Sequence, residues 1–358
     1  MTSRSPSLHE ITSLRVVREA RLYESLVNGR AQCFTCERRC IVKEDGWGFC
    51  KTRKNIKGCL YTVIYGDLSS VSINPIEKKP FFHYKPGSLA LTIGSWGCNF
   101  TCPWCQNHEI SKTPPSLNDG NYVNPWTLVE RALEGGCDGT SVSFNEPTLQ
   151  LEYSLDLFHL AKSRGLYNTY VSNGYMTPEA LKMLKDAGLD AVKIDLKGGC
   201  EAVRKYCGAD VEKVWRNINL ARSLGLHVEV VCLIIPGVND NQATVEEVCS
   251  RLSEMDEEIP LHFTRFHPEY QMTDRPSTPV KTLERAVEAA YRHGLKYVYL
   301  GNVPGHRYEN TYCPECGGLL IARQGFTVLK NRLSGNRCPR CGCRIPLIGP
   351  VKISTALW

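Results

Sequence analysis

The feature that most constrains the fold is an alternation of strand-like and helix-like segments that runs from residue 88 to about residue 302. Between the strand-like segments, apolar residues recur at helical spacing. Strands that alternate with helices form βαβ units around a parallel sheet. Six or seven such units predict an α/β fold, namely a partial or complete (β/α) TIM-like barrel. The predicted strands are 89–96, 139–145, 168–173, 190–197, 227–235, 260–266 and 296–302, and the predicted helices are 125–135, 148–164, 177–187, 201–224, 242–255 and 281–293.

The ends of the predicted strands carry polar residues or cysteines. In barrels of this kind, the chemistry takes place at the C-terminal ends of the strands. The shared placement of these segments therefore predicts one functional site. The segments are Cys98–Cys105, Asn145-Glu146-Pro147, Ser172-Asn173-Gly174, Asp195-Leu196-Lys197, Pro236-Gly237 and His267-Pro268.

The segment "GCNFTCPWCQNHEIS" (97–111) places Cys98, Cys102 and Cys105 at the spacing C-x3-C-x2-C. Three thiolates can hold three irons of a [4Fe–4S] cube, which leaves the fourth iron open to a small molecule. The structural alternatives are a zinc ion completed by His108, or three buried cysteines. We predict the open cluster as the metal site, with Trp104 shielding it.

This motif, with an aromatic residue just before its last cysteine, resembles the radical S-adenosylmethionine (SAM) superfamily over roughly residues 88–300. The resemblance implies that the open iron chelates the amino and carboxylate groups of SAM. It also implies that the reduced cluster cleaves SAM to methionine and a 5′-deoxyadenosyl radical, which abstracts hydrogen from a substrate.

The strand ends add to the resemblance. "FNEP" (144–147) resembles the family's Gly-Gly-Glu-Pro segment, which implies that Glu146, with Asn145, holds the SAM amino group. Phe144 and Asn145 replace two glycines of that segment. "SNG" (172–174) resembles the Thr-Asn-Gly strand end, which implies that Ser172 and Asn173 lie near the SAM ribose and carboxylate.

Three later segments give the remaining candidates for cofactor contacts. "KIDLK" (193–197) resembles the Asp-Leu-Lys segment of glycyl-radical-enzyme activases and implies a role for Asp195 and Lys197. "IIPGVND" (234–240) resembles the segment that packs on adenine, which points to Val238. His267 in "RFHPEY" is a candidate for binding substrate or the adenosyl group.

Over nearly its whole length, the chain resembles the radical SAM family of the AmmeMemoRadiSam system, which is similar to pyruvate formate-lyase activating enzymes. The segments that carry this resemblance include "NPIEKKPFFHYKPGSLALTIGSWGCNFTCPWCQNHEIS", "HFTRFHPEY" and "YCPECGGLLIARQGF". It implies Memo-like and AMMECR-like partner proteins and an electron donor. We expect an amphipathic helix over 1–30 within an N-terminal helix and Cys-rich metal-binding region (1–60), a hairpin extension (61–87), the barrel (88–308) and a zinc ribbon with a tail (309–358).

Two further cysteine clusters flank the predicted barrel. Cys313-x2-Cys316 and Cys338-x2-Cys341, separated by 21 residues, predict a four-thiolate zinc ribbon, with Cys343 as a spare. The N-terminal set Cys33, Cys36, Cys40 and Cys50 predicts zinc or a second iron–sulfur cluster, with Cys59 as a possible substitute ligand. The other cysteines are most simply buried apolar residues, although Cys207 is also a candidate hydrogen-atom donor.

Composition limits the other possibilities. Eighteen cysteines in metal-ligand clusters suit a reducing compartment better than a disulfide framework. The formal charge of +6 counts thiols as neutral, and bound metal–thiolate sites would reduce it to about +1, so the basic pI is weak evidence for a nucleic-acid partner. Without a signal-length or membrane-length apolar run, we expect a soluble, cytoplasmic protein.

Several functional alternatives stay open from the sequence. They are a glycyl-radical-enzyme activase, an RNA- or protein-modifying enzyme that docks through its zinc ribbon, and a non-catalytic metal-stapled binding protein. The segment 77–87 mixes basic and aromatic residues, a composition that can stack on single-stranded bases or simply plug the bottom of a barrel.

Overall fold

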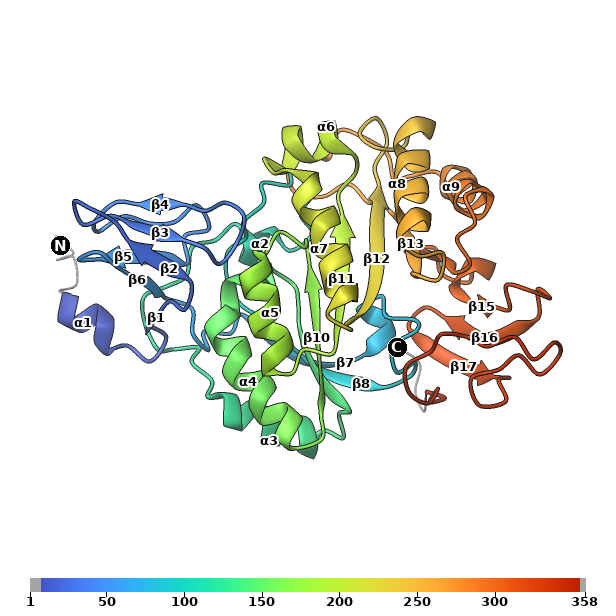
Figure 1. The fold of residues 1–358 in the computed structure, drawn as a ribbon, viewed down its shortest axis with the longest axis horizontal. Coiled ribbons are helices and arrows are strands. Elements are labelled where there is room, and N and C mark those ends of the chain that lie inside the picture. The colour runs from blue at the N-terminus through green and yellow to red at the C-terminus, as the bar shows by residue number, and fades with distance from the viewer. Residues whose placement is uncertain (1–7, 355–358) are drawn as a thin grey trace. The chain divides into compact units, whose positions relative to one another are not determined.

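The computed structural model describes residues 8–354 (Figure 1). The chain divides into two compact units, and each is described by itself below. Unit 1 comprises residues up to Ile73, Leu91–Phe100 and Asn107–Asp190, and unit 2 comprises Asn74–Ala90, Thr101–Gln106 and the residues from Ala191 onward.

The main sheet has eight strands that lie in chain order, from β7 to β14. The pairings β9–β10, β11–β12, β12–β13 and β13–β14 are parallel. This confirms the predicted α/β fold, and each predicted strand from residue 89 onward is present. The strands are β7 (Ser70–Pro75), β8 (Leu89–Gly94), β9 (Gly139–Val142), β10 (Tyr167–Ser172), β11 (Ala191–Leu196), β12 (His227–Ile234), β13 (Leu261–Arg265) and β14 (Val298–Gly301).

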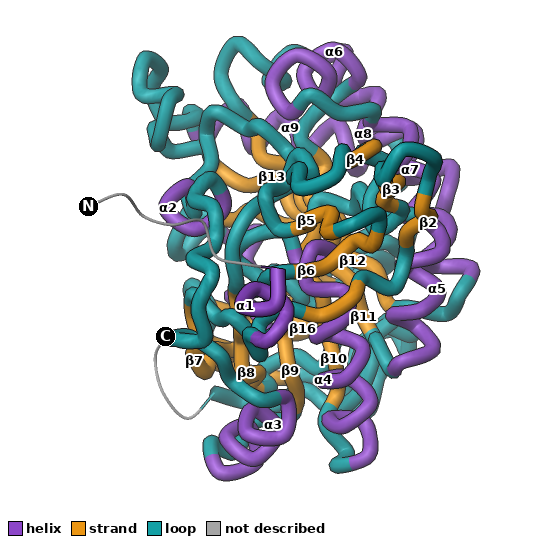
Figure 2. Tube along the Cα trace, turned by 90° about the vertical axis from the view of Figure 1, so that its left-hand side faces the viewer, coloured by secondary structure: helices purple, strands orange, loops and turns teal. Residues whose placement is uncertain are grey.

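In unit 1, helices pack against the parallel strands β9 and β10, which lie side by side in Figure 2. Helices α3 (Pro125–Glu134) and α5 (Pro178–Ala187) begin where predicted because a side chain caps each and proline occupies the first turn. Thr177, for example, accepts a hydrogen bond from the Ala180 amide. Helix α4 (Leu151–Ser163) follows the 3₁₀ turn η2 (Pro147–Gln150), and α2 (His108–Ser111) follows the cysteine loop.

The N-terminal part of unit 1 forms small antiparallel sheets, in the orders β1-β6-β5 and β2-β3-β4. The expected helix over 1–30 is wrong apart from α1 (Leu8–Ser13), and residues 1–7 lie outside the described part of the chain. Tertiary packing overrides the helical spacing, because Arg18 and Glu19 pair with β6 and Val16 and Val17 are buried. These strands are β1 (Arg18–Glu19), β2 (Tyr23–Ser25), β3 (Ala31–Cys33), β4 (Ile41–Val42), β5 (Arg53–Ile56) and β6 (Cys59–Thr62).

In unit 2, helices α7 (Val211–Ser223), α8 (Gln242–Met255) and α9 (Val280–Arg292) follow the predicted helical segments. The expected continuous helix over 201–224 is instead broken. A short turn α6 (Cys200–Ala202) runs into a π-helical turn η3 (Val203–Cys207), and Gly208 then takes a left-handed φ of 61°. The break brings the Cys207 side chain into the interior, where it is fully buried.

The remaining elements of unit 2 are short. The segment 76–84 begins with η1 (Ile76–Lys78), and its aromatic residues Phe81, Phe82 and Tyr84 are buried. They therefore fill the interior of this unit and offer no exposed face for stacking on bases. After η4 (Arg307–Glu309) the chain forms the sheet β15 (Thr311–Tyr312), β16 (Leu319–Gln324) and β17 (Thr327–Asn331). No helix within residues 8–354 is long and apolar enough to cross a membrane.

Candidate functional site

The three-cysteine loop follows β8, and its backbone passes from unit 1 to unit 2 between Phe100 and Thr101. In unit 1, the Cys98 sulfur accepts a hydrogen bond from the Phe100 amide at 3.4 Å, and the Asn173 amide lies 4.0 Å from the same sulfur. Gly97 precedes it with a φ of +78°, and a Cβ there would lie 2.7 Å from the Cys50 carbonyl oxygen. Only glycine therefore fits the turn that presents Cys98.

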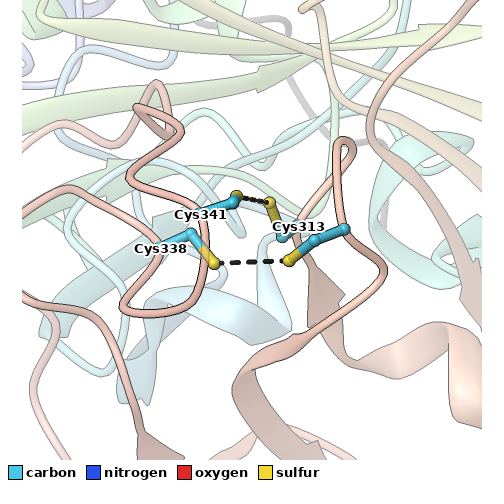
Figure 3. Close-up of side chains that lie close together, drawn as sticks. Cys313, Cys338 and Cys341 are labelled. Carbon is cyan, nitrogen blue, oxygen red and sulfur yellow. Dashed lines mark hydrogen bonds between the residues drawn. The ribbon is translucent and has the colours of Figure 1, made fainter.

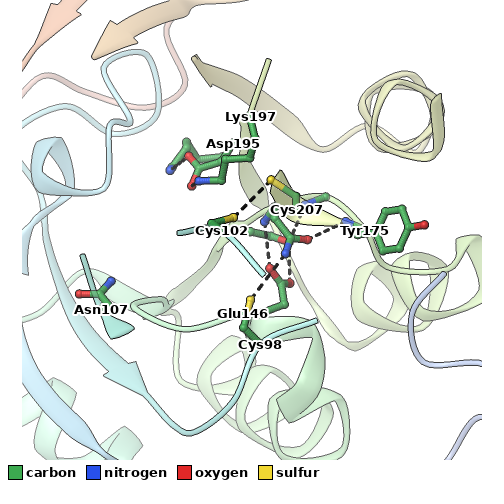
Figure 4. A network of polar contacts seen from close by, with 12 residues as sticks. Cys98, Cys102, Asn107, Glu146, Tyr175, Asp195, Lys197 and Cys207 are labelled. Carbon is green, nitrogen blue, oxygen red and sulfur yellow. Dashed lines mark hydrogen bonds and ion pairs between the residues drawn. The ribbon is translucent and has the colours of Figure 1, made fainter. Parts of the chain in front are cut away.

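In unit 2, the Cys102 sulfur lies 3.4 Å from the Cys207 sulfur (Figure 4). The Trp104 side chain is buried, and its ring lies 5.7 Å from that of Tyr206. The buried Trp104 indole nitrogen has no hydrogen-bond partner within the described chain. A buried N–H without a partner is costly, and the sulfur atoms of a bound cluster would accept from it. The donor set around the loop thus fits an iron–sulfur group.

Glu146 lies at the end of β9 and forms the centre of a buried cradle in unit 1. Its Oε1 accepts from the Thr148 amide at 3.1 Å, the Thr148 hydroxyl at 2.6 Å and the Ser172 hydroxyl at 2.7 Å. Its Oε2 accepts from the Asn173 amide at 2.9 Å. Burial raises the pKa of Glu146, and the hydrogen bonds from Thr148, Asn173 and Ser172 oppose that rise.

The cradle also connects Glu146 to the cysteine loop. Asn173 donates from its side chain to the Asn99 carbonyl oxygen Oδ1 at 2.7 Å, immediately after Cys98. The structure therefore brings together Cys98, Glu146, Ser172 and Asn173, four of the residues that the sequence singled out. They come from three separate strand ends, β8, β9 and β10.

Asn145 precedes Glu146 in the chain, but its side chain hydrogen-bonds to the backbone before Cys98. Its side chain accepts from the Ser95 amide at 2.9 Å and donates to the carbonyls of Trp96 and Gly97. Asn145 therefore holds the turn that precedes Cys98. Phe144 has a left-handed φ of 73°, a conformation that glycine adopts without strain. Phe144 therefore takes a backbone conformation that favours glycine, although its side chain is bulky.

Asp195 and Lys197 lie at the end of β11 in unit 2 and form a charge cluster with Lys193. Lys193 and Lys197 both pair with the Asp195 carboxylate, Lys197 at 3.0 Å. Burial alone would raise the pKa of Asp195, but the two lysines outweigh it and lower that pKa to about 2. Burial opposes the charge of Lys197, yet Asp195 raises the pKa of this lysine. Both partners are therefore charged at neutral pH.

These three residues line a large cavity that lies entirely in unit 2. Its volume is about 700 Å³, and its wall includes His262, Glu77 and Phe82. Val238 and His267 do not line this cavity. Val238 is half-buried in the turn after β12, and His267 is exposed with its ring nitrogen 2.9 Å from the Pro268 carbonyl.

Sequence reasoning missed Lys193 and His262, and also the buried Glu229. Glu229 accepts from the backbone amides of Phe82 and His83 at 3.0 and 2.8 Å, and it contacts His262 at 2.8 Å. The available signal was a charged residue inside an otherwise apolar strand pattern. Glu229 anchors the buried segment 81–84, and that segment forms part of the cavity wall.

The four cysteines of the predicted ribbon come together in unit 2 (Figure 3). Their sulfur atoms all lie within 4.8 Å of one another. The Cys313–Cys341 pair is separated by 3.5 Å and the Cys316–Cys338 pair by 3.6 Å. These residues could hold a metal ion, as their spacing predicts.

Known proteins are similar to this chain in sequence. A family model described as the radical SAM superfamily matches residues 93–249, so this segment of the chain is similar to that superfamily. Over 335 residues, this chain is 43% identical to an uncharacterized protein of Methanocaldococcus jannaschii. The aligned region covers 93% of this chain and 100% of that relative. The two proteins belong to the same family.

More distant relatives are also similar. A GTP 3′,8-cyclase of Aliarcobacter butzleri is 25% identical over 64% of this chain and 76% of its own length. Among solved structures, a radical SAM methyltransferase from Sphaerobacter thermophilus has a TM-score of 0.47 at 14% identity, covering 65% of this chain and 71% of that one. A domain of a pyruvate-formate lyase-activating enzyme from Bacteroides vulgatus has a TM-score of 0.39 at 15% identity. The match covers 46% of this chain and 99% of that domain.

Proposed function

We propose that this protein is a radical SAM enzyme whose Cys98, Cys102 and Cys105 hold a [4Fe–4S] cluster with one open iron. When bound, this group supplies the electron for reductive cleavage of SAM to methionine and a 5′-deoxyadenosyl radical, which abstracts hydrogen from the substrate. The observation that carries the proposal is the buried Glu146 cradle, which links the β9 and β10 strand ends to Asn99, the neighbour of Cys98.

The protein's own residues have distinct roles in this proposal. Glu146 offers acceptor lone pairs to the SAM amino group, and Ser172 and Asn173 hold that carboxylate in place. A carboxylate fixed by four donors does not have to reorganise when an ammonium group arrives, which favours binding. Trp104 covers the loop, so that water is excluded from the radical.

The charged cavity of unit 2 is the proposed substrate site. Asp195 and Lys197 line it from the end of β11, the strand end where chemistry takes place in such sheets. Both are fixed by their mutual ion pair, so they can orient a polar substrate without moving. The sequence resemblance further supports Memo-like and AMMECR-like partners and a separate electron donor.

We propose that the ribbon cysteines hold Zn²⁺. Zinc–thiolate bonds of about 2.3 Å in a tetrahedron place the sulfurs roughly 3.8 Å apart. The observed separations of 3.5 and 3.6 Å are close to this value, whereas thiolates on the corners of a four-iron cube lie farther apart. The spacing therefore favours one ion over a cluster.

Zinc analysis tests this assignment. We expect the purified protein to retain about one ribbon zinc that resists mild chelation, because a closed four-thiolate site binds zinc tightly. Cys316→Ser should lose it, since three thiolates leave the site open. Cys343→Ser is the matched control, because Cys343 lies outside the four-sulfur group, and it should keep the zinc. Iron in place of zinc at this site would contradict the assignment.

The main proposal is tested by SAM cleavage. Protein reconstituted anaerobically with iron and sulfide, then given SAM and dithionite, should form 5′-deoxyadenosine and methionine in equal amounts. Samples without dithionite should form neither, because cleavage needs one electron per SAM. Deuterium transfer from candidate metabolites, RNA or a glycyl-radical protein into 5′-deoxyadenosine then distinguishes the substrate classes. A fully loaded protein that binds SAM and yields no cleavage with any of them would refute the proposal.

A further inference from the structure

Cys207 is a buried thiol that the proposed function leaves without a role. Its side chain is 0% exposed, and its sulfur lies 3.4 Å from the Cys102 sulfur within unit 2 (Figure 4). Neither of the two other cysteine groups includes it. These groups are the cysteines that line a small cavity in unit 1, Cys33, Cys36, Cys40 and Cys50, and the ribbon cysteines, Cys313, Cys316, Cys338 and Cys341. The cysteine group that Cys207 contacts is the three-cysteine loop.

The turn that carries Cys207 has an unusual backbone conformation. Residues Val203–Cys207 form the π-helical turn η3, and Gly208 ends it with a left-handed φ of 61°, which favours glycine. A π-helical turn contains more residues than an α-helical turn, and such turns are rare and often occur at functional sites. The extra length changes the direction of the side chain at the end of the turn. This local break in the helix therefore directs the Cys207 sulfur toward the loop.

Three further contacts, all within unit 2, hold the η3 turn against the loop. The Thr101 backbone amide donates a hydrogen bond to the Cys207 carbonyl at 3.3 Å, and the Thr101 hydroxyl donates to the Tyr206 carbonyl at 2.8 Å. On the other side of Cys102, the Trp104 ring lies 5.7 Å from the Tyr206 ring. These contacts flank the two sulfur atoms, so the backbone of both segments fixes the short distance between Cys102 and Cys207.

The chemistry of metal binding decides which of the two sulfurs donates. Either could be the donor while both are thiols. A cysteine that binds iron does so as a thiolate, which has lost its proton. A second thiolate beside it in the protein interior would repel the first, so Cys207 keeps its proton. Once Cys102 is a ligand, the hydrogen bond therefore runs from the Cys207 S–H to the Cys102 sulfur.

We propose that the Cys207 thiol donates a hydrogen bond to the Cys102 sulfur and thereby raises the reduction potential of a cluster bound in the three-cysteine loop. Reduction adds one electron from an external donor, and the S–H dipole stabilises the added negative charge while the proton stays on Cys207. Hydrogen bonds to the sulfurs are among the features that set the potential of an iron–sulfur cluster. Cys207 acts through Cys102, so it is a positioning residue. The inference rests on the proposed function, because it needs that cluster.

A redox titration measures this effect. The full chain and its Cys207→Ala variant are each reconstituted anaerobically with iron and sulfide, titrated with dithionite and followed by electron paramagnetic resonance. The signal that SAM alters reports the loop cluster, because SAM needs an open iron to bind. At the wild-type midpoint, the ratio of reduced to oxidised cluster should be about tenfold lower in Cys207→Ala, which corresponds to a shift of about 59 mV to lower potential.

Three further variants separate the hydrogen bond from packing. Cys207→Val fills the space of the thiol but has no donor, so it should show the same shift as Cys207→Ala. Cys207→Ser keeps a hydroxyl donor and should return the potential toward the wild-type value. Cys249→Ala is the matched control, because Cys249 is also 0% exposed but belongs to helix α8 and not to the η3 turn. It should keep the wild-type potential.

The donated proton can be observed directly. After reconstitution in D₂O, electron–nuclear double resonance of the reduced wild type should show a coupled deuteron that Cys207→Ala lacks and Cys249→Ala keeps. Full iron content with an unchanged or higher potential in Cys207→Ala and Cys207→Val would overturn the proposal. Loss of iron from these two variants would make Cys207 a ligand and would overturn it as well. A wild type without any SAM-sensitive iron–sulfur signal would refute the proposed function instead.

Discussion

Replacing Cys102 by alanine is expected to abolish the formation of 5′-deoxyadenosine, to below about 1% of the wild-type rate, because two thiolates cannot retain a cluster with one open iron. Cys102 is buried, and its sulfur lies 3.4 Å from that of Cys207. The expected iron content falls by about four atoms per chain. The measurements are iron analysis and mass spectrometry of the nucleoside product after anaerobic reconstitution.

The matched control is Cys200→Ala. Cys200 is exposed at the start of α6 and belongs to none of the three cysteine groups, so its removal should change neither iron content nor SAM cleavage. Full iron and full activity in Cys102→Ala would mean that another thiol serves as the third ligand. Its neighbour Cys207 would be the first candidate for that ligand. The double variant Cys102→Ala/Cys207→Ala would then lose the iron that the single variant keeps.

Replacing Glu146 by glutamine is expected to lower SAM cleavage by about 30-fold or more and to destabilise the fold by about 2–4 kcal/mol. Glutamine can keep one carbonyl oxygen for Thr148 and Ser172, but its amide group then faces the Asn173 backbone N–H. Two donors would meet where a donor and an acceptor now pair. The variant also offers one acceptor fewer to the SAM amino group.

Anaerobic urea denaturation and SAM titration measure the two effects of this variant separately. Glu130→Gln is the matched control, because Glu130 pairs with Arg164 on the surface, where an ion pair contributes little. The control should unfold at nearly the wild-type urea concentration and cleave SAM normally. A Glu146→Gln variant with wild-type affinity for SAM would remove Glu146 from the proposed binding site.

The central α/β pattern could be predicted because its signals are local. Each strand between residues 89 and 301 is a short apolar segment, and helices such as α5 and α8 carry their own caps in Thr177 and Asn241. The spacing of the ribbon cysteines is equally local, since each CxxC pair lies on one turn. Strand order then followed from the chain order of the βαβ units.

Other features depended on contacts between distant segments. The apolar spacing near Val16 and Val17 suits a helix, but pairing of Arg18 and Glu19 with residues 61 and 62 makes a strand there instead. The break at Gly208 likewise appears only when Cys207 is packed into the interior, close to Cys102. Periodicity carries no information about such partners, because it describes one segment at a time.

The sequence alone therefore determined the parallel α/β architecture, the C-x3-C-x2-C loop and the four-cysteine group at the C-terminal end that could hold a metal ion. Only the tertiary structure decided which hydrogen-bond or ion-pair partner each buried polar group has. It pairs Glu146 with Asn173, Asp195 with two lysines, and Glu229 with the backbone of residues 82 and 83. The physical reason is that a buried polar group is stabilised by whichever partner the fold brings to it, and those partners lie far away in the chain.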